Sequence, residues 1–334
     1  MAVKMYSQAV KLRRNEYLPE GVATENADIG SVISSREELE AAAHSGAILE
    51  AMCQLCDCGT MSLHVELPCG IHGIIPKNEA GFNPAGDDIK DIAVITRVGK
   101  AVQFKIIEIY EDGRGETTAV LSRKSAQREV WERYIKALVP GDIVPARVTH
   151  LEPFGAFCDI GGGIVSLLTV DRISVSRISH PSDRFMTGDN IEVVIASTDD
   201  NRIYLTHREL LGTWEENASG FESGQTVTGI IRSVEDYGVF VELTPNLAGL
   251  AEVSGGVTVG DSCSVYIKSL IPSRMKIKLV LIDTCGKAPV MPCRYYIDTK
   301  RIGHIERWVY SPESSSKVIE TDFSMTGECE RAIR

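Results

Sequence analysis

Residues 154–157 of the chain read Phe-Gly-Ala-Phe, and residues 237–240 read Tyr-Gly-Val-Phe. Each tetrapeptide lies inside a longer stretch whose landmarks recur in the same order. A glycine begins the stretch, an alternating apolar segment leads to the aromatic pattern, a Gly-Asp pair follows, and a basic residue opens a final apolar alternation. Such recurrence indicates an internal repeat. We name 140–209 repeat 2 and 223–283 repeat 3.

Each repeat predicts five short strands separated by glycine and aspartate turns, with a long third connection. This pattern is typical of the OB-fold, a five-stranded barrel. A weaker copy, repeat 1, occupies 46–123, and there Cys-Gly-Thr-Met at 58–61 stands where the other copies carry the aromatic pattern. The sequence therefore predicts a mainly β protein of three tandem OB-fold barrels, the first one divergent.

Short helices are expected to join the barrels. Residues 124–139 place apolar side chains on one helical face and pair acidic with basic residues four positions apart. A shorter linker helix is expected in 210–222, and another short helix in the N-terminal extension, 1–45. Residues 284–334 show no repeat and are expected to form a C-terminal extension that is partly strand. The aromatic residues of this extension either form a further binding face or pack the lobe.

Alternation along the second strand of each repeat predicts which side chains leave the core. Every second residue of 239–243 is apolar and is expected to face inward. Phe240 and Glu242 are then expected to face outward, with Glu242 in solvent. The matching residues of repeat 2, Phe157 and Asp159, are expected to do the same.

The first aromatic residue of each pattern leaves two arrangements open. Strict alternation places Phe154 and Tyr237 inside the barrel, whereas a bend at the following glycine turns them outward. Two exposed rings side by side form a surface on which nucleic-acid bases stack, worth about 1–3 kcal/mol per base. Basic residues on the last strands are expected near this surface. The histidine in the third connection of repeat 2, His180, either contacts RNA or is an ordinary loop histidine. The candidate RNA-binding residues are Phe154, Phe157, His180, Arg202, Tyr237, Phe240, Lys276 and Lys278.

Composition narrows the function classes. The 334 residues include 35 basic and 46 acidic side chains, giving a net charge of −11. This charge excludes a generally basic protein that coats duplexes through phosphate contacts, but it permits a binder that stacks bases and places cations locally. No apolar run reaches the roughly 18 residues of a membrane helix, and the first residues lack the apolar core of a signal peptide. We expect a cytoplasmic protein with no membrane partner.

The nine cysteines are expected to be reduced thiols, since they are odd in number and no secretory signal precedes them. Three of them, Cys53, Cys56 and Cys58, resemble a zinc motif only superficially. A structural zinc site needs four convergent ligands, and no second Cys-x-x-Cys pair follows. Small buried cysteines are the commoner reading of this pattern. We predict no metal and no other cofactor.

Signatures of catalysis are lacking in the sequence. We find no Walker-type loop, no nucleophile elbow and no His-Glu-x-x-His motif. The triple glycine at 161–163 precedes a predicted strand, so it lacks the helix N-terminus that would help to hold a phosphate. We predict that the chain is not an enzyme.

Taken together, these motifs resemble the RNA-binding repeat of bacterial small-subunit ribosomal protein S1. The resemblance rests on Phe-Gly-Ala-Phe-Cys-Asp-Ile from Phe154, on Ser-His-Pro-Ser-Asp from Ser179, and on Asn-Arg-Ile-Tyr-Leu-Thr from Asn201. In repeat 3 it rests on 234–243 and 246–252. It covers about 46–283 and is strongest over 140–283.

The resemblance implies OB-fold repeats that bind single-stranded RNA, mRNA in particular, and support translation. It assigns the RNA face to the paired aromatics, to Arg202 and to Lys276. The family's third-strand histidine falls on Ser166 and Glu252, a departure from the family pattern. Repeat 1, without aromatics, is expected to contact proteins of the small ribosomal subunit. Two alternatives remain, a protein-interaction scaffold and an RNA-feeding subunit of an RNA-processing complex.

Overall fold

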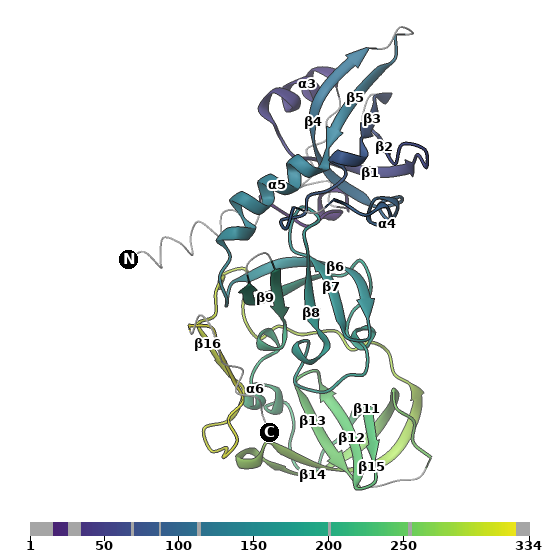
Figure 1. The fold of residues 1–334 in the computed structure, drawn as a ribbon. Coiled ribbons are helices and arrows are strands. Elements are labelled where there is room, and N and C mark those ends of the chain that lie inside the picture. Colours follow the sequence, from purple (N-terminus) through teal and green to yellow (C-terminus); the bar gives the residue numbers. More distant parts are fainter. Residues whose placement is uncertain are drawn as a thin grey trace. The chain divides into compact units, whose positions relative to one another are not determined.

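The structure, a computed structural model, describes residues 16–25, 35–67, 70–86, 88–111, 115–199, 202–252 and 256–324. It contains three closed five-stranded barrels in tandem (Figure 1), which confirms the predicted fold class. The chain divides into two compact units. The first holds the described residues up to Leu138 together with Pro145–Arg147 and Asp159–Val165, and the second holds the remainder. Within the described ranges, no helix combines the length and apolarity needed to cross a bilayer.

Repeat 1 forms the first barrel. Its strands are β1 (Leu49–Cys56), β2 (Leu63–Glu66), β3 (His72–Ile75), β4 (Ala101–Glu111) and β5 (Thr117–Ser122). Strands β3 and β5 pair in parallel, whereas the other neighbours pair antiparallel. Helices α2 (Val22–Glu25) and α3 (Arg36–Ser45) precede the barrel, and α4 (Asp91–Ile95) lies in the connection before β4.

Repeats 2 and 3 form the other two barrels with the same strand order. The second barrel contains β6 (Ile143–Glu152), β7 (Gly155–Asp159), β8 (Val165–Thr169), β9 (Asn190–Asp199) and β10 (Arg202–Thr206). The third contains β11 (Thr226–Glu235), β12 (Gly238–Thr244), β13 (Leu247–Ala251), β14 (Asp261–Ile271) and β15 (Lys276–Lys287). In both barrels the third and fifth strands are parallel.

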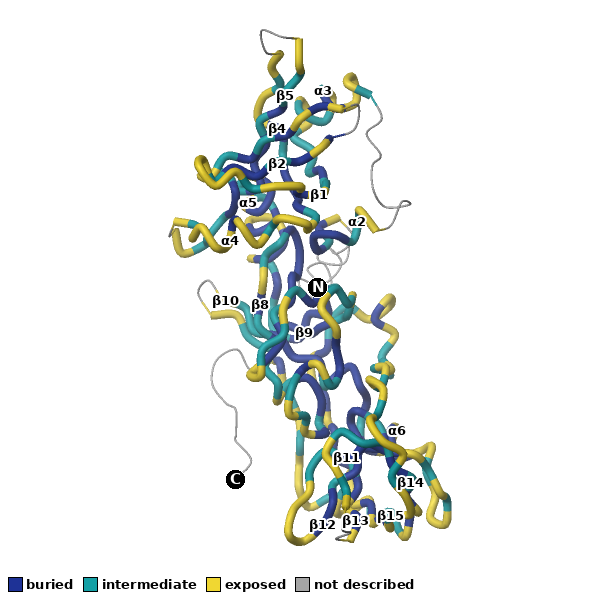
Figure 2. The backbone as a smooth tube through the Cα atoms, turned by 90° about the vertical axis from the view of Figure 1, so that its right-hand side faces the viewer, coloured by how far each residue is buried: buried dark blue, intermediate teal, exposed yellow. Residues whose placement is uncertain are grey.

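Alternation along β12 produces the core of the third barrel. Val239 and Val241 are fully buried, and the side chain of Phe240 between them is partly exposed. Cys263 of β14 lies in the same core. Figure 2 shows buried stretches of this barrel in dark blue among exposed stretches in yellow. Burial raises the pKa of the Cys263 thiol to about 11, so it stays protonated and unreactive at neutral pH. Cys263 is therefore a small apolar filler.

Helices lie in the connections between the barrels. Helix α5 (Arg123–Arg133) begins where the Ser122 hydroxyl accepts a hydrogen bond from the Ser125 N–H, and it buries Val130 and Trp131. Helix α6 (Trp214–Ala218) carries a capping box at Thr213. A side-chain oxygen at such a position satisfies a backbone donor that the helix leaves unpaired.

The C-terminal extension packs into the second unit. Strands β16 (Arg307–Val309) and β17 (Glu320–Asp322) form a two-stranded sheet. Trp308 and Tyr310 are buried in the same core as the third barrel, and the Tyr310 hydroxyl donates to the Asn246 carbonyl at 2.5 Å. Of the two readings of these aromatics, packing is the one that the structure shows for Trp308 and Tyr310.

Two acidic residues that were expected in solvent are buried, so that prediction is wrong. Glu242 is fully buried, and its carboxylate accepts hydrogen bonds from Arg184 at 2.5 Å and Arg232 at 2.8 Å. Asp159 is 1% exposed and accepts the backbone N–H groups of Glu20 and Gly161, each at 2.8 Å. Both carboxylates point away from the core of their own barrel but pack against a neighbouring segment of the chain. Alternation within a strand cannot predict that such a segment covers its outer face.

Replacing Glu242 by glutamine removes the negative charge that two buried guanidinium groups share. Breaking a buried ion pair leaves uncompensated charge, so we expect the free energy of unfolding to fall by about 3–5 kcal/mol. Urea denaturation of the full chain measures the change. Glu252→Gln is the matched control. Glu252 is exposed, and its carboxylate lies 3.9 Å from Lys268 Nζ. Such an exposed ion pair contributes about 0–1 kcal/mol to stability. Equal effects of the two substitutions would contradict the structural role of Glu242.

Candidate nucleic-acid interface

The third barrel presents two aromatic rings on its surface. Tyr237 is 67% exposed and Phe240 is partly exposed, with ring centroids 6.2 Å apart and planes at 89°. This edge-to-face arrangement is favourable for aromatic pairs and leaves ring area open. Of the two arrangements considered for Tyr237, the outward one is therefore present.

Tyr237 faces outward because it precedes the strand. It lies in the tight turn between β11 and β12, so strand alternation does not apply to it. The next residue must be glycine, since a Cβ at Gly238 would lie 2.6 Å from the Ala251 carbonyl oxygen and 2.7 Å from a Leu250 methyl group. The glycine of the pattern thus allows β12 to approach β13 closely.

Strand register aligns the rest of the surface. Phe240 pairs with Leu250 of β13, and Leu250 pairs with Lys278 of β15. Because paired residues on one face lie side by side, a ring, an aliphatic side chain and a cation form one row. Lys276 and Lys278 are both exposed and share a face of β15, two residues apart. The structure thus brings Phe240, Lys276 and Lys278 to one side of the barrel.

The second barrel repeats this arrangement with more rings. Phe154 is 55% exposed, and its ring centroid lies 5.9 Å from that of Phe157 at 89°. His150 stacks on Phe157 at 6.3 Å and 25°. Sequence reasoning missed His150, although its place on the strand before the aromatic turn marked it as a neighbour.

On the last strand of the second barrel, Arg202 is exposed at the position of Lys276. Tyr204, which pairs with Leu167, takes the position of Lys278. This tyrosine was also missed, because the two repeats differ in residue type there. The second barrel is therefore richer in aromatic rings, and the third in cations.

His180 has a structural role in the loop. It precedes a short 3₁₀ helix, Pro181–Asp183, and its Nδ1 accepts the Ser182 N–H at 3.1 Å. Its own N–H donates to the Asp183 carboxylate at 3.4 Å. Among the described residues, no ring contact joins His180 to Phe154 or Phe157, so the structure does not place it with the other candidates.

Barrel register also corrects the third-strand position. Leu167 pairs with Tyr204 as Leu250 pairs with Lys278, so Thr169, two residues on, is the counterpart of Glu252. The assignment of this position to Ser166 was therefore wrong by three residues. The glycine contacts agree, because a Cβ at Gly155 would meet the Leu168 carbonyl, just as one at Gly238 would meet that of Ala251.

The same register changes the counterpart of the aromatic pattern in repeat 1. His64 pairs with Ile74, and Ile74 pairs with Val120, so His64 occupies the position of Phe240. Met61 then corresponds to Tyr237, and Met61–His64 replaces 58–61 as the matching tetrapeptide. The alignment from sequence alone was wrong because the Cys58-Gly59 pair resembles the aromatic-glycine pair of the other repeats.

The cysteine-rich segment of repeat 1 does not gather ligands among the described residues. Cys53 is buried in β1 and Cys58 is exposed. His64 and His72 are hydrogen-bonded to each other, Nδ1 to Nε2, at 2.8 Å. In the part of the chain that the structure describes, no group of three or more His, Cys, Asp or Glu side chains could hold a metal ion. Cys69 lies outside the described residues.

Replacing Gly238 by alanine places a methyl group against the Ala251 carbonyl. Since this neighbour is a backbone atom of a barrel strand, relief requires β12 and β13 to separate, and we expect the free energy of unfolding to fall by about 1–3 kcal/mol. Gly220→Ala is the matched control, because nothing lies within 4 Å of its Cβ position. Guanidinium unfolding of both variants measures the difference, and a neutral Gly238 variant would refute the close approach.

Comparison with known proteins gives a consistent assignment. Residues 138–208 match the S1 RNA binding domain family. The chain is 27% identical over 230 residues to small ribosomal subunit protein bS1 of Chlamydia muridarum, covering 64% of this chain and 39% of that protein. It is 29% identical over 192 residues to bS1 of Staphylococcus aureus strain COL, covering 54% and 48% respectively. The chain thus spans less than half the length of these relatives.

A solved structure, a multidomain protein with nucleic acid binding domains from Streptococcus pneumoniae, covers 71% of this chain and 74% of its own. The identity is 14% and the TM-score 0.24, values too low to support an argument about function. The domain match and the bS1 relatives together show similarity to S1 RNA binding domains and to small ribosomal subunit proteins. They confirm the resemblance to small-subunit ribosomal protein S1 that the repeats indicated.

Proposed function

We propose that this chain binds single-stranded RNA, mRNA in particular, through repeats 2 and 3, and that it supports translation without being an enzyme. The observation that carries the proposal is the pair of exposed edge-to-face rings at the same position of two consecutive barrels. Bases stack on such rings whatever their identity, because every base has a π-face. Sequence-tolerant binding suits a protein that meets many mRNAs.

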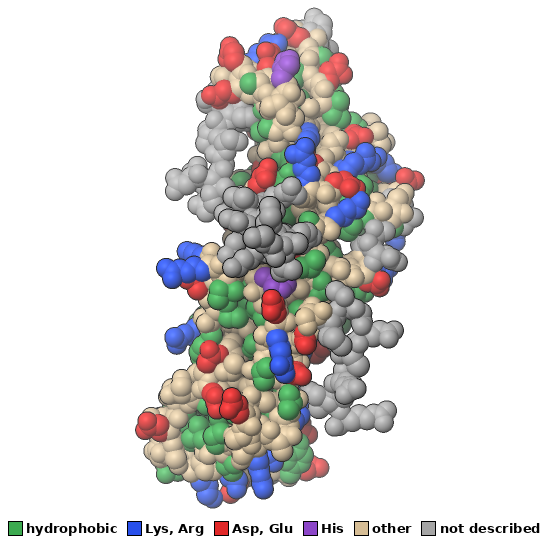
Figure 3. Space-filling model, turned by 90° about the vertical axis from the view of Figure 1, so that its left-hand side faces the viewer, with side chains coloured by type: hydrophobic (Ala, Val, Ile, Leu, Met, Phe, Trp, Pro, Cys, Tyr) green, Lys and Arg blue, Asp and Glu red, His purple; other side chains and the backbone are tan. Residues whose placement is uncertain are grey.

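Charge supports stacking over phosphate binding as the main source of affinity. The net charge is −11, and acidic and basic side chains are interspersed on the face drawn in Figure 3. Phosphate contacts therefore come from a few cations beside the rings, namely Arg202, Lys276 and Lys278. A binder with few phosphate contacts loses little affinity as salt rises, because few counterions are released.

Repeat 3 and most of repeat 2 belong to one compact unit, which favours their joint use. The buried cluster of Arg184, Glu242 and Arg232 joins the third connection of repeat 2 to the second strand of repeat 3. Modules linked in this way bind one RNA strand more tightly than either alone, because the second contact becomes intramolecular.

Substituting both second-strand rings tests the proposal. Phe157→Leu with Phe240→Leu keeps an apolar side chain at each position but removes two stacking surfaces, each worth about 1–3 kcal/mol. We expect the dissociation constant for a pyrimidine-rich single strand to rise at least tenfold. Fluorescence anisotropy with the full chain measures it, and duplex RNA of equal length should bind weakly to both proteins.

Tyr266→Leu is the matched control for that experiment. Tyr266 is an aromatic residue of the same barrel, 39% exposed on β14, where it pairs with Val280 rather than with Phe240, Leu250 or Lys278. Its loss should leave RNA affinity unchanged. If the double variant binds RNA as tightly as the original chain, the aromatic rings serve another purpose, and the protein-interaction scaffold becomes the better explanation.

We further propose that repeat 1 contacts proteins of the small ribosomal subunit, which implies a cytoplasmic location. Exposed apolar side chains on β1 and α4 support this contact. They are Met52, Leu55, Ile92 and Ile95, of which Ile92 is 63% exposed. A protein partner bound to repeat 1 would remove these apolar groups from water, which is favourable.

Ile92→Asp tests the ribosomal contact. A charge in an apolar interface must be desolvated, so we expect the variant to co-sediment with purified small subunits several-fold less than the original chain. Ile302→Asp in the C-terminal extension, where Ile302 is 45% exposed, is the control. Equal co-sedimentation of both variants and the original would argue against this surface.

A further inference from the structure

Repeat 1 has its own pair of rings at the position that the exposed aromatic pair occupies in repeats 2 and 3. His64 stands where Phe240 stands in repeat 3, and His72 of β3 lies beside it. The two imidazole centroids are 5.0 Å apart, and the rings share a hydrogen bond. Partial burial, aided by His72, lowers the pKa of His64 below its ordinary value. At neutral pH the ring of His64 is therefore an uncharged aromatic surface.

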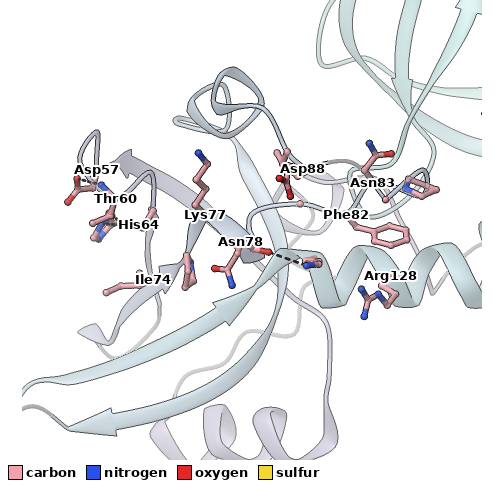
Figure 4. A pocket seen from close by; sticks show the side chains of 17 residues that line it. Asp57, Thr60, His64, Ile74, Lys77, Asn78, Phe82, Asn83, Asp88 and Arg128 are labelled. Atoms are coloured by element: carbon pink, nitrogen blue, oxygen red, sulfur yellow. Dashed lines mark hydrogen bonds between the residues drawn. The ribbon is translucent and has the colours of Figure 1, made fainter.

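A large cavity opens beside these rings. It measures about 1050 Å³ and lies entirely within the first unit. Figure 4 shows His64 and Ile74 toward one end and Phe82 with Arg128 toward the other, with Asn78 and Lys77 between them. The volume is at the upper end of the range for small-molecule sites, roughly 300–1,000 Å³. It is ample for a nucleotide and far too large for a single ion.

Two cations of α5 line the cavity between Asn78 and Phe82. Lys124 and Arg128 project from α5, and the Arg128 guanidinium lies 5.6 Å from the centroid of the Phe82 ring. A guanidinium over an aromatic ring forms a cation–π pair, and aromatic rings and arginines both contribute to the binding of single strands. Helix α5 thus supplies the cations that β15 supplies in repeat 3.

The carboxylates of the cavity are few and partly engaged. Asp57 accepts the backbone N–H groups of Gly59 at 2.6 Å and Thr60 at 3.2 Å. Asp57 lies at the histidine end in Figure 4, away from Arg128. Asp88 also lines the cavity, and Lys77 is paired with Asp91 at 2.6 Å. Lys124, whose Nζ donates to the Asn78 carbonyl at 3.4 Å, and Arg128 are therefore the groups best placed to meet a phosphate.

We propose that repeat 1 contains a third RNA-contacting site, in which unstacked bases lie against His64 and Phe82 and a backbone phosphate meets Lys124 and Arg128. The inference takes its ligand, single-stranded RNA, from the function proposed above. It changes the role of repeat 1, which sequence reasoning expected only to contact protein. The site and the apolar side chains of α4 and β1 involve different residues, so the two roles are compatible.

Photo-cross-linking of the full chain tests this site. The probe is a single-stranded oligouridine of roughly a dozen nucleotides in which one uridine is replaced by 4-thiouridine, and mass spectrometry locates the cross-linked peptides. We expect cross-links in peptides of 57–89 or 124–128 in addition to those near Phe157 and Phe240. His64→Ala combined with Arg128→Ala should lower the repeat 1 cross-links at least fivefold and leave the others unchanged.

Two further variants separate binding from folding. His64→Phe restores the aromatic residue of the other repeats and should retain or increase the repeat 1 cross-links. Lys136→Ala removes an exposed cation that pairs with Glu132 outside the cavity, and it should change nothing. Circular dichroism of each variant confirms that the barrels remain folded.

The outcomes distinguish the two proposals. Cross-links confined to repeats 2 and 3 overturn the inference and leave the proposed function standing. Absence of RNA binding by every form of the chain overturns both. Repeat 1 cross-links that persist at full yield in the His64→Ala and Arg128→Ala variant place the RNA elsewhere on repeat 1 and also overturn the site.

Discussion

Each barrel depends on one pairing, the parallel alignment of its third and fifth strands. Closing five short strands into a barrel requires a fixed stagger between neighbours, so this pairing determines which residues stand side by side on the outer surface. It sets Phe240, Leu250 and Lys278 in one row in repeat 3. The same rule applies to repeats 1 and 2, whatever side chains they carry. Barrel closure thus determines where on each barrel the candidate binding surface lies. The residue types at those positions determine the chemistry of the surface.

A side chain on the outer face of a barrel is not necessarily exposed to solvent. Phe240 and Glu242 leave β12 on the same side, yet Glu242 is buried between Arg184 and Arg232. A carboxylate deprived of water is tolerated when cations and hydrogen bonds replace its hydration. Asp159 in repeat 2 follows the same logic with backbone donors. In each case the residue two positions after the exposed ring holds a neighbouring segment.

Local patterns predicted the barrels, the outward positions of Phe157 and Phe240, and the cations on the last strands, because alternation and recurrence are local properties. The burial of Glu242 depends on Arg184, which is 58 residues away, and no pattern within a strand reports such a partner. The match of His64 to Phe240 depends on the strand register in the barrel. The sequence at 58–61 resembles the aromatic pattern, and this resemblance led to the wrong alignment. His150 and Tyr204 lie beside the exposed rings of repeat 2 because of contacts between strands. These contacts, too, become visible only in the folded structure.

The three surfaces differ in a way that bears on how they work together. Repeat 3 combines two rings with two lysines, repeat 2 has three rings and Tyr204 beside one arginine, and repeat 1 has imidazoles beside a cavity whose cations come from a helix. Stacking is nearly independent of salt, whereas phosphate contacts weaken as salt rises. A strand held by such unlike surfaces keeps part of its affinity under any one condition. In the function and the site proposed above, each contact is individually weak, so the strand exchanges between surfaces without leaving the protein.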